Sequence, residues 1–168
     1  MSGPKNPLQK QLDHGKFLRA VQYVSQASRG LKKLTSSELA QLNQMITEAQ
    51  DDVWRLTPTE VQIPSGKKIQ FNVASNPIVR ARDIIGDASQ MAGNQEIFEA
   101  ASYIYSKLVL EHLFNDANRR TAVLATLWLL HESGVEVDAE KLHHIPIGDL
   151  RDPSNLASLA ERIRALKI

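Results

Sequence analysis

Two of the most apolar segments of this chain are joined by the stretch His112-Leu113-Phe114-Asn115-Asp116-Ala117-Asn118-Arg119-Arg120-Thr121. Before it, apolar residues at helical spacing predict a helix over residues 95–112. After it, a strongly apolar run predicts a second helix from residue 118 or 119 to residue 133, closed by Gly134. We call this stretch the junction, a short polar connection between two apolar helices.

Helices are predicted on both sides of this pair as well. Thr35 and Glu38 have the spacing of a capping box, and the apolar face that follows them predicts a helix reaching Val53. Apolar spacing and capping residues predict four more helices, over residues 8–28, 78–91, 139–144 and 153–165.

A single hairpin interrupts the helical pattern. Residues 61–63 and 69–73 alternate apolar and polar side chains around a turn at 64–68, which is typical of two paired strands. The predicted fold class is therefore all-α, a helical bundle with one small β-hairpin. We expect one domain over residues 1–168, made of N-terminal helices (1–56), the hairpin (57–76), a core with the junction (77–135) and C-terminal helices (136–168).

Composition excludes several classes of protein and of site. The chain has 168 residues, a formal net charge of +1 and no cysteine, which rules out disulfides, thiol nucleophiles and Cys-based zinc sites. Near-neutrality predicts no nucleic-acid or membrane partner, and no apolar stretch reaches the length of a membrane span. The polar N-terminus is unlike a secretory signal, so we expect a cytoplasmic location, with a secreted effector left open.

The junction places cations where a helix disfavours them. Arg119 and Arg120 stand at the start of a helix, whose macrodipole is positive there and costs about 0.3–1 kcal/mol for each cation. A bound anion would reverse that sign. Free backbone N–H groups, two guanidinium groups and the amide of Asn118 predict a site for phosphate.

Two further side chains of the junction suggest a reaction. Asp116 offers the hard oxygen ligand that Mg²⁺ takes beside substrate phosphates, and His112 could deprotonate a hydroxyl near neutral pH. Together they indicate metal-assisted transfer of a phosphate-containing group to an alcohol. The alternative is a capped helix junction, with Asp116 capping and paired to an arginine. Phe114 is a core anchor under either interpretation.

The pattern His112-x-Phe114-x-Asp116-x-Asn118-x-Arg120 resembles the signature of the Fic/Doc family, H-x-F-x-[D/E]-[G/A]-N-[G/K]-R. The following Thr121-Ala122 and the apolar helix match too, especially in the Doc branch. The family also has a β-hairpin flap upstream of its motif, so the resemblance covers roughly residues 60–135. It implies a small α-helical bundle.

The resemblance implies a role for each matching residue. His112 would activate a hydroxyl of a target protein, and Asp116 would bind Mg²⁺. Nucleotide phosphates, from ATP or another nucleoside triphosphate, would be held by Asn118 and Arg120, with Arg119 adding a charge beside them. Phe114 would anchor the loop. The flap would dock the target by adding a strand, which we place at Ile69, Gln70 and Phe71.

Three departures favour one branch of the family. The adenylylating branch has glycine at the positions of Ala117 and Arg119 and arginine at that of Val123. Alanine and a bulky cation resemble Doc, a kinase, so we favour phosphorylation and leave AMP transfer open. The self-inhibitory signature [S/T]-x-x-x-E-[G/N] is absent from this chain, which predicts a toxin-like modifier restrained by a separate antitoxin-like chain.

Two alternatives to an enzyme stay open at this point. One is a catalytically weak scaffold that binds a nucleotide or a protein through the same groove, and the other is a helical module without a ligand. Arg80 and the pair His143-His144 could also hold phosphate or metal, but surface and packing roles are commoner for such residues. Target, nucleotide preference, regulator and oligomeric state are left undefined by the sequence.

Overall fold

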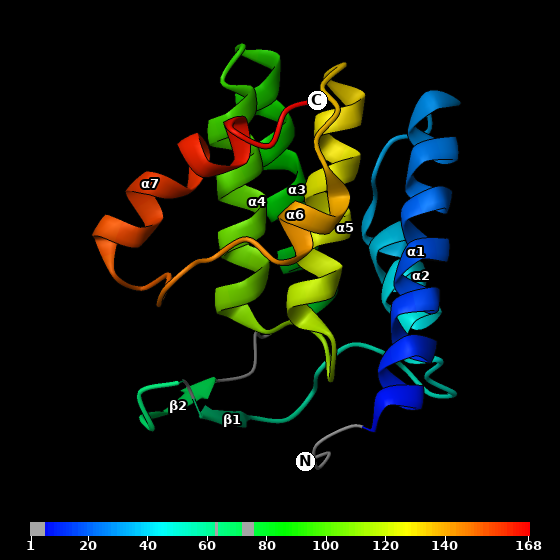
Figure 1. Cartoon of the computed structure of the whole chain (residues 1–168), viewed down its shortest axis with the longest axis vertical. Helices are drawn as coiled ribbons and strands as arrows, with labels where there is room; N and C mark the ends of the chain where they lie inside the picture. The colour runs from blue at the N-terminus through cyan, green and yellow to red at the C-terminus, as the bar shows by residue number, and fades with distance from the viewer. Residues whose placement is uncertain (1–5, 63, 72–75) are drawn as a thin grey trace.

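The computed structural model describes residues 6–62, 64–71 and 76–168. The elements follow one another along the chain (Figure 1) as α1 (Pro7–Arg29), α2 (Ser36–Thr47), β1 (Thr59–Gln62), β2 (Lys68–Phe71), α3 (Pro77–Gly93), α4 (Ile97–Glu111), α5 (Asn118–Glu132), α6 (Ala139–His143) and α7 (Pro153–Arg164). The predicted fold class, all-α with one hairpin, is confirmed. In the described part of the chain, no helix combines the length and the hydropathy needed to cross a bilayer.

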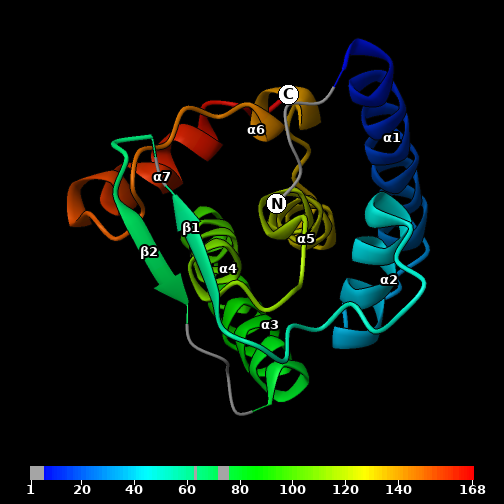
Figure 2. The same cartoon turned by 90° about the horizontal axis from the view of Figure 1, so that it is seen from below.

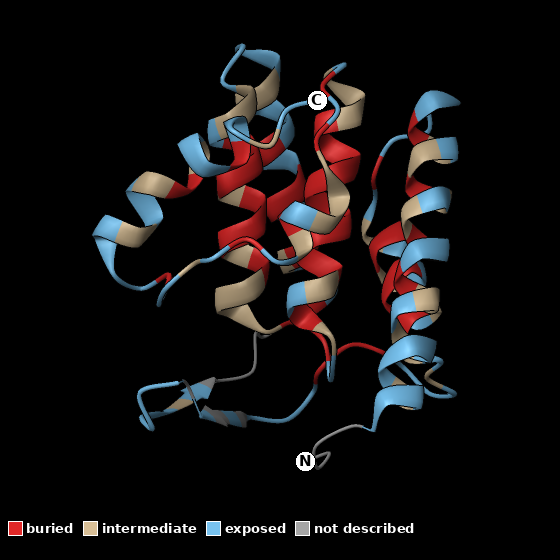
Figure 3. Ribbon diagram, in the orientation of Figure 1, coloured by how far each residue is buried: buried red, intermediate tan, exposed pale blue. Residues whose placement is uncertain are grey.

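Helix α5 forms the centre of the bundle. Every residue from Thr121 to Leu130 is buried, which requires neighbours on all sides because a helix buried all round has no solvated face. Seen from below, α1 and α2 flank α5 on one side and α3 and α4 on the other (Figure 2). The buried residues of Figure 3 accordingly concentrate on α5 and on the sides of α3 and α4 that face the interior. The N-terminus of α5 leads directly back to the junction.

Thr35 begins α2, as its position in the predicted capping box requires. Its hydroxyl oxygen accepts a hydrogen bond from the backbone N–H of Glu38 at 3.2 Å. The other half of the box is replaced by tertiary contacts. The carboxylate of Glu38 accepts a hydrogen bond from the Tyr23 hydroxyl at 2.7 Å and pairs with Lys32 at 2.6 Å. The side chain that would cap α2 instead attaches it to α1.

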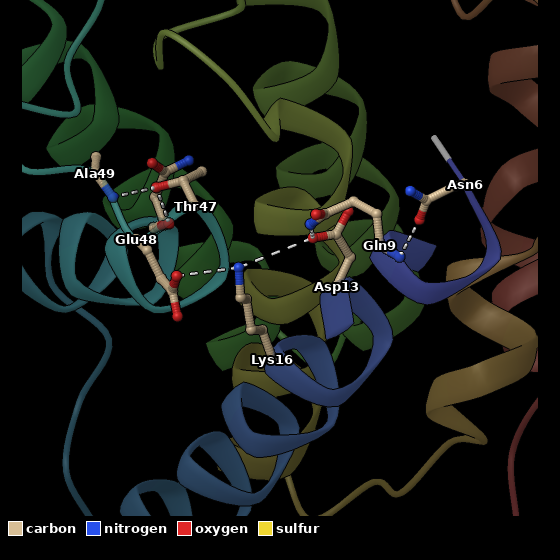
Figure 4. Close-up of polar contacts among 8 residues, drawn as sticks. Asn6, Gln9, Asp13, Lys16, Thr47, Glu48 and Ala49 are labelled. Atoms are coloured by element: carbon tan, nitrogen blue, oxygen red, sulfur yellow. Dashed lines mark hydrogen bonds and ion pairs between the residues drawn. The ribbon is translucent and has the colours of Figure 1, made fainter. Parts of the chain in front are cut away.

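The helix predicted to reach Val53 is shorter than expected. It ends at Thr47, because Glu48 takes a left-handed conformation with φ +53° and its N–H closes the last turn on Gln44. Lys16 of α1 reaches across to the Glu48 carboxylate at 3.2 Å (Figure 4). Val53 is buried all the same, in a segment that leaves α2 and crosses to the junction. The prediction was wrong because tertiary packing, not the helix, accounts for that apolar residue.

The predicted hairpin is present, with slightly shifted strands. β1 and β2 pair antiparallel from Thr59 opposite Phe71 to Gln62 opposite Lys68. Residues 63, 72 and 73, which the sequence pattern included in the strands, lie outside the described residues. Among the described residues, no third strand joins this sheet. An isolated hairpin is marginal in water, and this one lies below the bundle end (Figure 1) with a cavity between them.

A short backbone pairing connects the segment before the hairpin to the junction. The N–H of Arg55 donates to the carbonyl of Leu113 at 2.8 Å, and the N–H of Asn115 donates to the carbonyl of Val53 at 3.0 Å. Trp54 and Phe114 stand opposite each other in this antiparallel bridge, and their rings stack with centroids 4.6 Å apart. Both side chains are buried. The chain therefore enters the hairpin from a position that the junction itself defines.

Replacing Trp54 by alanine tests this connection. The variant Trp54→Ala is expected to lose about 3–5 kcal/mol of unfolding free energy, since a buried aromatic side chain and its stacking partner are both affected. Urea denaturation measures the loss. Trp54→Phe, which keeps an aromatic ring over Phe114, is the control and should lose less. Equal stability of Trp54→Ala and the wild type would contradict the connection.

Candidate active site

Two residues of the junction take the left-handed conformation, one at the end of α4 and one just before α5. His112 ends α4 with φ +47°, and Ala117 precedes α5 with φ +58°. The left-handed region costs a residue with a Cβ about 1–2 kcal/mol. Such conformations persist where the surroundings impose them, and they gather at functional sites. The turn between α4 and α5 is therefore imposed by its surroundings.

Asn118 supplies much of that constraint. Its amide nitrogen donates to the carbonyl of Phe114 at 3.0 Å, and its amide oxygen accepts from the N–H of the same residue at 3.0 Å. Asn118 is buried, as is Phe114. From the sequence, we predicted that this amide binds phosphate. In the structure both of its polar atoms hold the loop, so Asn118 would contribute to a phosphate site through the loop shape and its backbone.

A second amide, which the sequence analysis missed, holds the loop from α2. The side-chain nitrogen of Asn43 donates to the carbonyl of Asp116 at 2.8 Å and to the hydroxyl of Thr121 at 3.0 Å. Asn43 is almost completely buried. A polar residue on the apolar face of a predicted helix was the available signal, because such a group requires a buried partner.

One hydrogen bond of the His112 imidazole shows which ring nitrogen carries the proton. Its Nδ1 lies 2.8 Å from the carbonyl oxygen of Val109, which can only accept. Nδ1 therefore carries the proton in the neutral ring, and Nε2 keeps the lone pair that a base needs. Burial, and to a smaller extent the positive charge of Arg55, lower the pKa of His112, while the bond to Val109 opposes them. The ring is thus neutral at pH 7.

His112 lines a cavity of about 660 Å³ at the end of the bundle. Its walls come from the hairpin, the end of α4, the start of α5 and the segment after α6. Ile69 of β2 contributes on one side, and Ile147 and Leu150 contribute on the other. The charged residues of the lining are Lys67, Arg119, Asp149 and Arg151. A volume of this size suits a nucleotide-sized ligand.

The two arginines of the junction diverge. Arg119 lies on the wall of the His112 cavity, where its Nε donates to the Tyr105 hydroxyl at 3.2 Å and its Nη2 donates to the carbonyl of Ile145 at 2.9 Å. Arg120 instead lines a separate hollow of about 300 Å³ between α1, α5 and α6. The structure therefore brings Arg119, and not Arg120, to the His112 cavity.

The start of α5 lacks a side-chain cap. Ala117 occupies the capping position and has no oxygen to offer, and the first turn holds no acidic residue. Four backbone N–H groups at a helix start need partners, and an anion satisfies them while reversing the cost of the two arginines. By contrast, α1, α2, α3, α6 and α7 each begin with a side-chain oxygen that accepts a hydrogen bond from a backbone N–H of the first turn.

Asp116 is an exposed residue in the middle of the junction. Its Oδ1 accepts from the N–H of Ala117 at 2.7 Å. One carboxylate beside phosphates is the donor set that Mg²⁺ ordinarily takes, so this residue fits the predicted metal as half of a shared site. Within the described ranges, no group of three or more His, Cys, Asp or Glu could hold a metal without such help.

The predicted docking residues lie on β2. Ile69 faces the cavity, Gln70 is exposed, and Phe71 is placed in the strand by its backbone pairing with Thr59. Opposite them, the segment after α6 is braced by Arg151, whose guanidinium forms two bonds with the Asp149 carboxylate. Those bonds lower the pKa of Asp149 to about 2. The pair is therefore charged and locally neutral, so Lys67 and Arg119 set the positive charge of the cavity.

The other candidates from the sequence have structural partners. Arg80 forms two hydrogen bonds with the carboxylate of Glu111, at 2.6 and 2.7 Å, and so attaches α3 to the end of α4. His143 stacks on Phe17 of α1, with ring centroids 4.5 Å apart. His144 is exposed and lies 3.8 Å from Glu140. Each of the three side chains therefore has a neighbour within the protein.

The left-handed conformation of Ala117 yields a stability test. Ala117→Gly should raise the unfolding free energy by about 0.5–1 kcal/mol, because glycine takes positive φ without the cost of a Cβ. Ala157→Gly is the matched control, since Ala157 is exposed inside α7 and glycine there should destabilise by a similar amount. Urea denaturation compares the two. A loss of stability in Ala117→Gly would contradict the strained turn.

Comparison with known proteins gives a consistent result. A model of the Fic/DOC family matches residues 33–130, which include the junction and the hairpin. The protein kinase doc of Escherichia phage P1 is 33% identical over 91 residues, covering 52% of this chain and 72% of that protein. A Fic domain-containing signaling protein from Bacteroides thetaiotaomicron has a similar structure, with a TM-score of 0.66 at 18% identity, covering 99% of this chain and 74% of that chain. The chain belongs to the Fic/DOC family.

Proposed function

We propose that this protein is a transferase that moves a phosphate-containing group from a nucleoside triphosphate to a hydroxyl side chain of a target protein. The observation that carries the proposal is the arrangement around the 660 Å³ cavity. His112 and Arg119 both line it, Arg119 belongs to the uncapped first turn of α5, and the two-stranded hairpin forms another wall. A base, an anion site and a protein-docking edge are the parts that this reaction requires.

The chain's own groups would act as follows. Nε2 of His112 takes the proton of the target hydroxyl while the oxygen forms a bond to phosphorus. The bond from phosphorus to the leaving nucleotide or pyrophosphate breaks, and the leaving group carries its negative charge away. The Nδ1–H bond to Val109 keeps the imidazole oriented as it becomes positively charged. The lowered pKa of His112 keeps the base unprotonated before this step.

The phosphates would lie at the start of α5. Its free N–H groups and Arg119 supply positive charge there, and Asp116 would hold Mg²⁺ against the phosphates. When bound, the ion neutralises charge that develops on the phosphate oxygens. Arg120 would approach from the α1 side of the same helix start, and reach the phosphates only by a change of side-chain conformation.

Phosphorylation is the reaction that we favour over AMP transfer. Arg119, held by Tyr105 and Ile145, occupies the cavity wall with a bulky cation. The similarity to a protein kinase supports the same choice. The target would extend the hairpin sheet along β2, beside Ile69 and Gln70. A separate restraining chain, as the missing self-inhibitory signature predicts, is part of the same proposal.

Transfer of isotopic label tests the proposal directly. The protein is incubated with cell lysate, Mg²⁺ and ATP labelled at either the α- or the γ-phosphate. We expect label in protein from the γ position only, which indicates phosphorylation. Label from the α position only would indicate AMP transfer and overturn our choice of reaction. ATP binding without transfer of either label would favour the scaffold alternative.

Replacing the base is the companion experiment. His112→Ala should reduce transfer by at least about a hundredfold, because a general base contributes roughly 10²–10⁴. ATP binding, measured by calorimetry, should survive. His131→Ala is the control, since His131 is half-buried at the opposite end of α5. Full activity of His112→Ala would contradict the assignment.

The pH dependence of transfer follows from the pKa of His112. Because burial lowers that pKa from its ordinary value of 6.5, the rate should be constant near pH 7. It should fall as the pH drops through the lowered pKa, where the base becomes protonated. The acid limb of kcat/KM measured from pH 5 to 8 checks this. A midpoint above 6.5 would exclude a buried, neutral His112 as the base.

A further inference from the structure

Arg55 directs its guanidinium at backbone carbonyls. The side chain is 4% exposed. Its Nε donates to the carbonyl of His112, its Nη2 to the carbonyl of Glu111 at 3.3 Å, and its Nη1 to the carbonyl of Thr57 at 2.7 Å. Arginine is suited to such a task because its planar group donates in several fixed directions.

Two of those carbonyls, from Glu111 and His112, lie at the end of α4, where a helix leaves acceptors unsatisfied. The last carbonyls of a helix have no partner within it, and a positive charge near them is favourable. Arg55 also reaches this turn through its backbone, whose N–H donates to Leu113 at 2.8 Å. Three consecutive carbonyls, from Glu111 to Leu113, are therefore held by one residue.

We propose that Arg55 is a positioning residue for His112: by holding the carbonyls of the last turn of α4, it maintains the left-handed conformation that presents the imidazole to the cavity. The inference rests on the proposed function for its catalytic consequence. Without the guanidinium of Arg55, the carbonyls of Glu111 and His112 lose the donors that it supplies. The turn would relax towards ordinary backbone angles and carry the ring away from the bond to Val109.

The same guanidinium connects the base to the root of the hairpin. Thr57 stands two residues before β1, and its carbonyl is an acceptor of Arg55. A target strand that displaces the hairpin would thus act on the side chain that holds His112. Docking and base position are linked through one buried cation.

The charge of Arg55 also acts on the imidazole. Its positive charge lowers the pKa of His112, although burial of the ring lowers that pKa more. Other charged residues come from the elements that wall the cavity, namely Lys67 from the hairpin turn, Arg119 from α5, and the mutually neutralising Asp149 and Arg151. Loss of Arg55 therefore removes one positive charge and exposes the ring, and both changes favour protonation.

Nuclear magnetic resonance of the His112 ring tests the proposal without any substrate. In Arg55→Met, the pKa of His112 should rise towards 6.5, and the Nδ1-protonated form should lose its dominance in long-range ¹H–¹⁵N spectra. Arg55→Lys keeps a buried charge but cannot span the carbonyls, so it should show the tautomer change even if Arg55→Met fails to fold. A folded variant with the wild-type tautomer and pKa would overturn the proposal.

Transfer kinetics supply the second readout. Arg55→Met should lower kcat by about 10- to 100-fold with little change in KM for ATP, because a displaced base slows the chemical step while the phosphate site stays intact. Arg80→Met is the matched control: it breaks the contact with the Glu111 side chain at the same helix end but leaves the carbonyls held. It should lower stability and leave the His112 spectra unchanged.

The two readouts separate the two proposals. If the wild-type protein transfers no label, the proposed function fails, and the ring spectra of the Arg55 variants still decide whether Arg55 positions His112. If transfer occurs and the spectra of a folded Arg55 variant equal those of the wild type, the positioning role fails and the proposed function stands. A change in the Arg80→Met spectra as large as that in Arg55→Met would also overturn a specific role for Arg55.

Discussion

The pairing of residues 53–55 with residues 113–115 is the constraint on which the rest of the site depends. Its two backbone hydrogen bonds join a segment that has left α2 to the turn between α4 and α5. Trp54 and Phe114 stack across it and exclude water from both strands. The hairpin begins just beyond, so its place over the cavity follows from this pairing. The buried arginine beside Trp54 extends the same connection to the end of α4.

Most of the helical frame could be predicted from local sequence signals. Prolines at helix starts and side chains such as Thr35 and Asp152 set the beginnings of helices through contacts within a few residues. The end of α2 could not be predicted in this way. Ala49 and Val53 continue the apolar period, and a residue buried by a distant segment produces the same pattern as one buried by its own helix. Only the tertiary pairing separates the two cases.

In the candidate site, too, local sequence gives only part of the answer: it shows the residue types but not the directions in which their side chains point. The sequence shows which residue types stand at the junction, because their order along the chain is visible there. It could not show that Arg119 and Arg120, adjacent on a helix and thus about 100° apart, line different hollows. Nor could it show that Asn118 turns inward to Phe114. Arg55 lies far away along the chain, so nothing in the junction pointed to it.

The electrostatic design of the site comes from backbone geometry as much as from side chains. The start of α5 has neither a capping oxygen nor an acidic residue, and a buried cation holds the carbonyls at the neighbouring end of α4. Two helix termini of opposite polarity thus meet at the turn, one held by a buried cation and one without a side-chain cap. This asymmetry is what singles out the six-residue connection, from His112 to Ala117, as the candidate site.

The bridge between residues 53–55 and 113–115 is built from main-chain groups, which every residue except proline carries in full. A substitution at Val53, Leu113 or Asn115 therefore leaves the donors and acceptors of the bridge in place. The side chains of Val53 and Leu113 can therefore change as long as the neighbouring packing adapts, whereas the Asn115 amide adds its own bonds to the carbonyls of Asp52 and Trp54. The backbone geometry of the turn can therefore be kept while side chains change, so chains that have few residues in common can share the fold.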